Sequence, residues 1–145
     1  MSFINPYLIF NGTCEEAFNF YKSVFGGDYN YLGRFKDVPQ EDGSEPMDEE
    51  FANRIMHVSL PIGKNILMGS DSNPAMGEVI IGKNVNISIN VESKEEANRL
   101  FEGLSKGGNI TMPMQDTFWG DYFGMTEDKY GIEWMISYNK EFKAP

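Results

Sequence analysis

Residues 11–27, NGTCEEAFNFYKSVFGG, and residues 91–107, VESKEEANRLFEGLSKG, are two versions of one helical pattern. An offset of 80 residues places the Glu-Glu-Ala of the first copy on the Glu-Glu-Ala of the second. Apolar side chains recur in both copies at i, i+3, i+4 and i+7, which is the spacing of one helix face. They are Ala17, Phe20, Tyr21 and Val24, and Ala97, Leu100, Phe101 and Leu104. The chain is therefore an internal duplication whose unit contains an amphipathic helix.

The two helical patterns carry the same signals at their ends. Thr13 and Ser93 stand where an N-cap is expected, and a glutamate follows each of them three residues later. This spacing predicts a capping box at both helix starts. Glycine pairs at 26–27 and 107–108 follow the last apolar positions, as they do at helix C-termini.

Strand candidates surround both helices in the same order. One precedes each helix and three follow it, and their composition and turn residues set the approximate bounds. The candidates are 7–10, 29–35, 54–60 and 65–69 in the first half, and 85–91, 111–115, 122–126 and 133–138 in the second. The pattern predicts two β-α-β-β-β units, which is an α+β fold.

Composition narrows the possible partners and location. The 145-residue chain has 12 Lys and Arg against 22 Asp and Glu, a formal net charge of −10, which argues against nucleic-acid binding. No apolar run approaches the ~20 residues that span a bilayer, so no membrane partner is expected. The first residues have no basic region and are interrupted by Asn5 and Pro6, so a cytoplasmic location is the expectation. Cys14 is the single cysteine, which excludes an intramolecular disulfide.

The acidity is concentrated in residues 37–53, which hold seven Asp and Glu and no Lys or Arg. Two interpretations stay open for this stretch. It is a solvated loop, which is the usual role of a run of charges, or a mobile rim that attracts a cationic ligand.

Three segments resemble the PhnB-like branch of the vicinal oxygen chelate superfamily, the glyoxalase/bleomycin-resistance type. They are PYLIFNGTCEEAFNFYKSVFGG (6–27), IMHVSLPIGKNILMGSD (55–71) and MPMQDTFWGDYFGMTEDKYGIEWMIS (112–137). The resemblance covers essentially the whole chain. It implies two tandem β-α-β-β-β modules, 1–75 and 80–145, which form a curved eight-stranded mixed sheet around a cleft in one domain, 1–145. Such proteins are often labelled 3-demethylubiquinone 3-methyltransferase-like, but the sequence has no Gly-rich βα turn followed by an acidic residue about 20 positions on, as nucleotide-type cofactors require.

The resemblance also implies where a metal would be held, with two positions in each module. Carried over by position, these are Pro6, Leu67, Asn86 and Met135. Pro6 and Leu67 have no donor atom, Met135 offers a soft thioether, and Asn86 offers one carbonyl oxygen. A divalent metal site takes three or four His or carboxylate ligands. We therefore expect neither a metal nor another cofactor.

Strand alternation selects the side chains expected on the cleft face. His57, the only histidine, and Glu133 are candidates for a general acid and base. Each has a structural alternative: a hydrogen-bonded or ligand-orienting role for His57, and a partner for Arg54 or a partly solvated position for Glu133. Trp119 and Phe118 in the 115–120 loop fit a ligand pocket, or packing at its mouth or at a dimer contact. The expected ligand-binding set is Phe10, Ser59, Asn86, Ser88, Asn90, Gln115, Phe118, Trp119 and Met135.

Three functions follow as hypotheses. The first is a metal-free protein that binds a small molecule. The second is a lyase or isomerase, metal-independent or metal-dependent, in which His57 and Glu133 transfer a proton. The third is a structural homodimer whose cleft is filled by side chains, because exposed sheet edges of single modules favour association.

Overall fold

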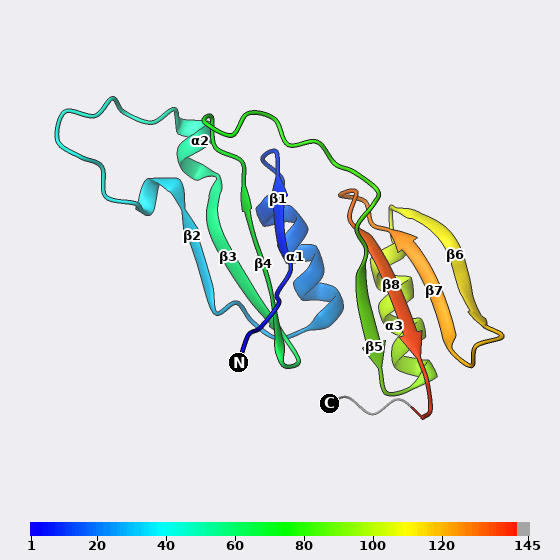
Figure 1. Cartoon of the computed structure of the whole chain (residues 1–145). Helices are drawn as coiled ribbons and strands as arrows, with labels where there is room; N and C mark the ends of the chain where they lie inside the picture. The colour runs from blue at the N-terminus through cyan, green and yellow to red at the C-terminus, as the bar shows by residue number, and fades with distance from the viewer. Residues whose placement is uncertain (142–145) are drawn as a thin grey trace. The chain divides into compact units, whose positions relative to one another are not determined.

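A computed structural model describes residues 1–141 of the chain (Figure 1). The chain divides into two compact units, Met1–Ile80 (unit 1) and Ile81–Pro145 (unit 2). Each unit contains one long helix and four strands. No helix among the described residues is long and apolar enough to cross a membrane.

Unit 1 is a four-stranded sheet with one long helix packed on it. Strands β3 and β4 are an antiparallel hairpin, β2 adds antiparallel to β3, and β1 adds parallel to β4, so the order is β1-β4-β3-β2. The elements are β1 (Tyr7–Phe10), α1 (Cys14–Phe25), β2 (Tyr31–Arg34), the 3₁₀ helix η1 (Phe35–Asp37), α2 (Glu49–Asn53), β3 (Ile55–Ile62) and β4 (Asn65–Asp71).

Unit 2 repeats this topology. Its sheet order is β5-β8-β7-β6, with β5 parallel to β8 and the other pairs antiparallel. The elements are β5 (Ile87–Val91), α3 (Lys94–Ser105), β6 (Asn109–Asp116), β7 (Tyr122–Glu127) and β8 (Glu133–Tyr138). The duplicated β-α-β-β-β order predicted from sequence is therefore confirmed.

The eight strands form two four-stranded sheets rather than one eight-stranded sheet. The reason is the parallel pairing of β1 with β4, and of β5 with β8, because this crossover completes a sheet within each repeat. The cleft that the resemblance implies stays a prediction.

Each helix approaches its sheet at a glycine. A Cβ at Gly69 of β4 would lie 2.6 Å from the Phe18 ring of α1, and a Cβ at Gly124 of β7 would lie 3.0 Å from the Phe101 ring of α3. The aromatic rings occupy the space that a side chain would otherwise take. Around these contacts the buried core of each unit forms between the helix and one face of its sheet.

The predicted capping boxes are only partly present. Ser93 Oγ accepts a hydrogen bond from the Glu96 amide, but the Glu96 carboxylate accepts from the Glu92 amide instead of from Ser93. Thr13 makes no side-chain cap bond, so the box expected at α1 is wrong. A carboxylate from a distant strand, Asp71 of β4, occupies that helix start instead.

The acidic 37–53 stretch is less irregular than expected. It contains α2, and all seven of its carboxylate side chains belong to exposed residues. Exposure of the whole set agrees with the interpretation of a solvated segment. Strand β2 is shorter than the predicted 29–35, because the chain turns into η1 after Arg34.

Candidate functional site

The face of sheet β1-β4-β3-β2 opposite α1 carries His57. Register partners share a face, so Val58 with Gly69 and Leu60 with Leu67 lie under α1. The alternate residues therefore lie on the opposite face, which we call the helix-free face of unit 1. It comprises Tyr7, Tyr31, His57, Ser59 and Met68.

His57 lies between two tyrosines on this face. The Tyr7 ring stacks on the imidazole with centroids 5.6 Å apart, and the Tyr31 ring lies 5.9 Å away on a tilted plane. Tyr7 Oη is 3.3 Å from His57 Nδ1. When the hydroxyl donates to Nδ1, the ring proton is on Nε2 at the opposite edge of the imidazole. This arrangement leaves Nε2 as the donor for a ligand.

Ser59 and Phe10 are placed differently from one another. Ser59 lies on the helix-free face between its register partners Tyr31 and Met68, and it is 8% exposed. Phe10 was expected on that face too, and this orientation is wrong. It is 1% exposed and meets Phe18 of α1 edge-on at 6.4 Å, because β1 pairs Leu8 with Gly69 beneath the helix.

The register of β4 also corrects one of the metal positions that the resemblance implies in unit 1. Leu67 lies on the α1 side and is 3% exposed. The residues that follow Pro6 and Leu67, Tyr7 and Met68, lie on the helix-free face and are register partners. Within residues 1–141, no three His, Cys, Asp or Glu side chains gather as a metal site would require.

The helix-free face of unit 2 carries polar and apolar side chains, and its polar residues on β5 follow the alternation of residues 86–91. Ser88 pairs with Met135, and Asn90 pairs with Ser137, whose hydroxyl donates to Asn90 Oδ1 at 2.7 Å. Trp134 and Ile136 are buried on the α3 side. We define this face by Ser88, Asn90, Phe123, Met125, Glu133, Met135 and Ser137.

Glu133 begins β8 and pairs in register with Glu127. It is 8% exposed, and burial together with the neighbouring Glu127 raises the pKa of its carboxyl. Lys83 Nζ is 3.0 Å from Glu127 Oε2 and offsets part of this effect. The partner considered for Glu133, Arg54, is instead paired with Glu50. Glu133 is thus a carboxyl that retains its proton more strongly than usual.

Asn86 is adjacent to this carboxyl pair in the fold. It precedes Ile87, whose register partner is Trp134, so it is level with Glu133. Its Oδ1 is buried and accepts no hydrogen bond from any described residue. A buried acceptor without a donor is costly, and a ligand N–H or O–H would satisfy it.

The 115–120 loop brings aromatic rings to the end of the same face. Trp119 packs edge-on against Phe123 at 5.9 Å, and its Nε1 donates to Asp121 at 2.9 Å. Phe118 is 96% exposed and meets Trp119 at 5.0 Å. Gln115 is exposed and pairs in register with Phe123.

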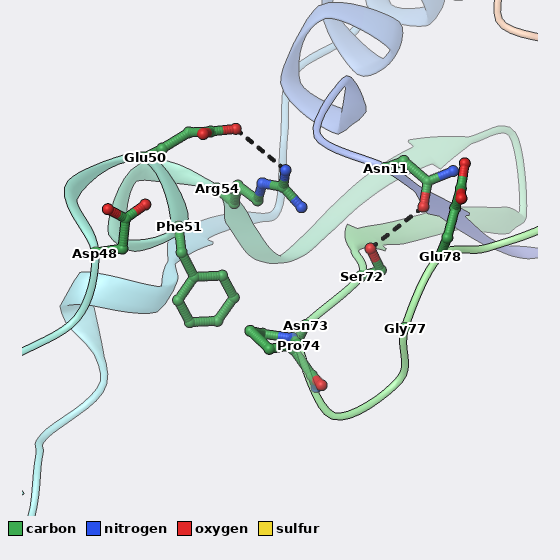
Figure 2. A pocket seen from close by; sticks show the side chains of 10 residues that line it. All are labelled: Asn11, Asp48, Glu50, Phe51, Arg54, Ser72, Asn73, Pro74, Gly77 and Glu78. Carbon is green, nitrogen blue, oxygen red and sulfur yellow. Dashed lines mark hydrogen bonds and ion pairs between the residues drawn. The ribbon is translucent and has the colours of Figure 1, made fainter. Parts of the chain in front are cut away.

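Two further surface cavities lie outside the helix-free faces, and neither was predicted as a cavity from the sequence. One, of about 450 Å³, is in unit 1 beside α2 (Figure 2). The other, of about 430 Å³, is at the start of α3 in unit 2 and includes Ser93, Lys94 and Tyr122. Their linings come from short, separated segments, so no local motif marks them.

Comparison with known proteins identifies the family. The family model described as 3-demethylubiquinone-9 3-methyltransferase matches residues 2–137. The chain is 42% identical to protein PA1353 from Pseudomonas aeruginosa, with a TM-score of 0.81 and coverage of 96% of this chain and 98% of that one. It is 32% identical to protein YjdN of Escherichia coli K12 over 95% of this chain and 96% of the relative.

A solved structure from Bacillus cereus, described as a putative 3-demethylubiquinone-9 3-methyltransferase, PhnB protein, is 25% identical. Its TM-score is 0.71, with 94% of this chain and 99% of that chain covered. Glyoxalase-related and fosfomycin-resistance structures below 25% identity share the fold alone. The chain therefore belongs to the 3-demethylubiquinone-9 3-methyltransferase family, in agreement with the PhnB-like resemblance of its sequence.

Proposed function

We propose that this chain is a metal-free small-molecule binding protein whose ligand contacts are on the helix-free faces. The observation that carries the proposal is the composition of these faces. Both present aromatic rings beside a few hydrogen-bonding groups. Unit 1 has Tyr7, Tyr31 and His57, and unit 2 has Trp119 packed on Phe123, the register partner of Ser137. Ligand sites have this mixture, because rings bury area while sparse polar groups set orientation.

Unmet hydrogen-bonding capacity supports the same proposal. Asn86 Oδ1 is buried without a donor among the described residues. His57 Nε2 is free to donate when Tyr7 donates to Nδ1. A ligand donor would satisfy Asn86 in unit 2, and a ligand acceptor would satisfy His57 in unit 1.

Methyl transfer from a nucleotide-type cofactor has less support. Such cofactors use backbone amides at the start of the first helix to hold an anionic group. Here the amides of Gly12 and Cys14 already donate to Asp71 Oδ1, at 2.9 and 3.0 Å. The start of α1 is therefore occupied by a side chain of the same unit.

A thermal-shift screen of metabolites and antibiotics tests the binding proposal, because a ligand that binds only the folded state raises the melting temperature. Hits that bind unit 1 should lose their shift in His57→Ala, and hits that bind unit 2 should lose it in Trp119→Ala. Both kinds should keep it in Phe20→Ala, whose side chain lies on α1. A broad set without any stabilising compound would count heavily against the proposal. Elemental analysis of protein purified without chelator tests the claim that the protein binds no metal. Stoichiometric Ni, Zn, Fe or Mn would contradict that claim.

A second candidate function is proton transfer, as in a lyase or isomerase. It is favoured by the buried Glu133, since a carboxyl with a raised pKa keeps its proton to a higher pH than an ordinary glutamate and can donate it as a general acid. His57 belongs to unit 1 and Glu133 to unit 2, so the two roles need separate tests. Any turnover found should fall at least tenfold in Glu133→Gln and stay unchanged in Glu102→Gln, an exposed residue of α3. Equal turnover in both variants would remove Glu133 from the mechanism.

A further inference from the structure

The cavity beside α2 combines one guanidinium, free carboxylates and an apolar wall. Figure 2 shows Arg54 between Glu50 on one side and Asn11 with Glu78 on the other, while Phe51 and Pro74 lie below it. The cavity encloses about 450 Å³, which is within the usual range for small-ligand sites. None of the helix-free-face residues lines it, so it is a separate site.

Arg54 is available for a ligand carboxylate. Among the described residues its guanidinium pairs with Glu50, whose Oε1 lies 3.2 Å from Nη2. The Glu50 side chain is 79% exposed, and an exposed pair at i, i+4 contributes little. The Arg54 side chain is 26% exposed and its guanidinium lies against Gly12. This planar fork can therefore exchange Glu50 for a bidentate ligand carboxylate.

The remaining charges at the cavity are negative. Asp48 and Glu78 are exposed at its rim, and among the described residues no hydrogen bond or ion pair joins either carboxylate to another group. Together with Glu50 they outnumber the guanidinium three to one. A simple anion would be repelled by this rim, whereas an ammonium group would be attracted to it.

The wall of the cavity is apolar. Phe51 stacks on Phe35 with ring centroids 4.3 Å apart, which holds the Phe51 ring in place. Pro74 lies near Phe51 in the same wall (Figure 2). A rigid ring and a proline offer contact area to an apolar body at low entropic cost.

We propose that this cavity binds a small zwitterion of the amino-acid type. Its carboxylate pairs with Arg54, its ammonium faces Glu78 and Asp48, and its apolar side chain packs on Phe51 and Pro74. This proposal stands independently of ligand binding on the helix-free faces.

Three probes with one phenylethyl body separate the contributions of the two charges. L-Phenylalanine carries both charges, phenethylamine only the ammonium, and 3-phenylpropionate only the carboxylate. In amide chemical-shift titrations, L-phenylalanine should shift the amides of residues 11–12, 72–73 and 75–78. It should bind at least about tenfold more tightly than either analogue. Equal affinity for phenethylamine would overturn the zwitterion assignment. Shifts confined to the helix-free faces, or none at these residues, would overturn the site.

Variants test the residues. Arg54→Gln should weaken the binding of L-phenylalanine by about tenfold or more. Arg54→Lys should weaken it by less, because lysine keeps the charge and loses the planar fork. Glu78→Gln should weaken the binding of L-phenylalanine and of phenethylamine, but not the binding of 3-phenylpropionate. Glu45→Gln and Arg99→Gln, outside the cavity, serve as matched controls. Unchanged affinity in Arg54→Lys and Glu78→Gln, with native amide spectra, would contradict the proposal even if Arg54→Gln fails to fold.

Discussion

Asp71, the last residue of β4, accepts a hydrogen bond from the backbone amide of Cys14, the first residue of α1, at 3.0 Å. The same Oδ1 accepts from Gly12, and Oδ2 accepts from Ile55 at 2.9 Å. One carboxylate, 3% exposed, therefore joins the helix start to two strands. Its position explains why Thr13 is not needed as a cap.

Asp71→Asn should destabilise unit 1 by roughly 1.5–3 kcal/mol, because the new NH₂ would face a backbone N–H and a charged acceptor would be lost. The measurement is urea unfolding followed by far-UV circular dichroism. Tryptophan fluorescence follows unit 2 separately, since Trp119 and Trp134 both lie there. Asp42→Asn, at an exposed acidic position, is the control. A midpoint equal to that of the control would mean that Asp71 is not a structural cap.

Gly69→Ala should lower the free energy of unfolding by about 1–3 kcal/mol. A Cβ there would lie 2.6 Å from the Phe18 ring and 2.7 Å from the Leu8 carbonyl oxygen. The backbone contact cannot be relieved by a rotamer change. Gly82→Ala is the control, since the nearest atom to its added Cβ is Asn84 Oδ1 at 3.4 Å. Denaturant midpoints compare the two variants, and equal midpoints would contradict close helix-to-sheet packing at Gly69.

Glu133 should make unit 2 less stable as pH rises. Its pKa in the folded state is raised above the ordinary value of 4.5 by burial and by Glu127. A carboxyl whose pKa is raised by folding binds its proton more tightly in the folded state than in the unfolded state. Its contribution to folding stability is therefore full below pH 4.5 and is lost as pH rises through the folded-state pKa. The stability of Glu133→Gln relative to the parent chain should therefore increase between pH 4 and pH 7.

Tryptophan fluorescence during urea unfolding at several pH values measures this difference, because Trp134 follows Glu133 directly in β8. Glu102→Gln, exposed on α3, provides the comparison. A pH-independent difference between Glu133→Gln and the parent chain would show that Glu133 titrates normally.

Phe118→Ala should leave folding stability within about 0.5 kcal/mol, because the ring is 96% exposed. If it contacts ligand, as we propose, compounds found in the screen should bind the variant more weakly while its mass in light scattering is unchanged. A loss of self-association in the variant would instead favour a dimer contact, and the homodimer would then become the better account of this loop.

The sequence predicted the strand faces of unit 2 better than those of unit 1. Residues 86–91 alternate strictly between polar and apolar, and the observed face of Ser88 follows that pattern. Residues 7–10, YLIF, are apolar or aromatic throughout, so alternation offered no choice and Phe10 was assigned to the wrong face. There the register with β4 decides the orientation, and register is a long-range property.

Long-range contacts also account for the other differences. The Thr13 and Glu16 pattern is a local signal, but Asp71 comes from 57 residues beyond Cys14 and accepts from the Gly12 and Cys14 amides at the same helix start. Glu127 and Glu133 flank a turn, yet only the β7–β8 register shows that they face one another. The α2 cavity brings Asn11, Arg54 and Glu78 together from three separate segments, which no single stretch of sequence reveals.

The two helix starts have different consequences for the order of folding. Ser93 caps α3 from within its own first turn, so that helix can nucleate as soon as residues 93–96 are made. The cap of α1 arrives only with β4, after a loop of 57 residues has closed. Although the two halves share one ancestral pattern, we expect α3 to be ordered in the folding transition state and α1 to be completed later, which φ-values at Ser93 and Asp71 would measure.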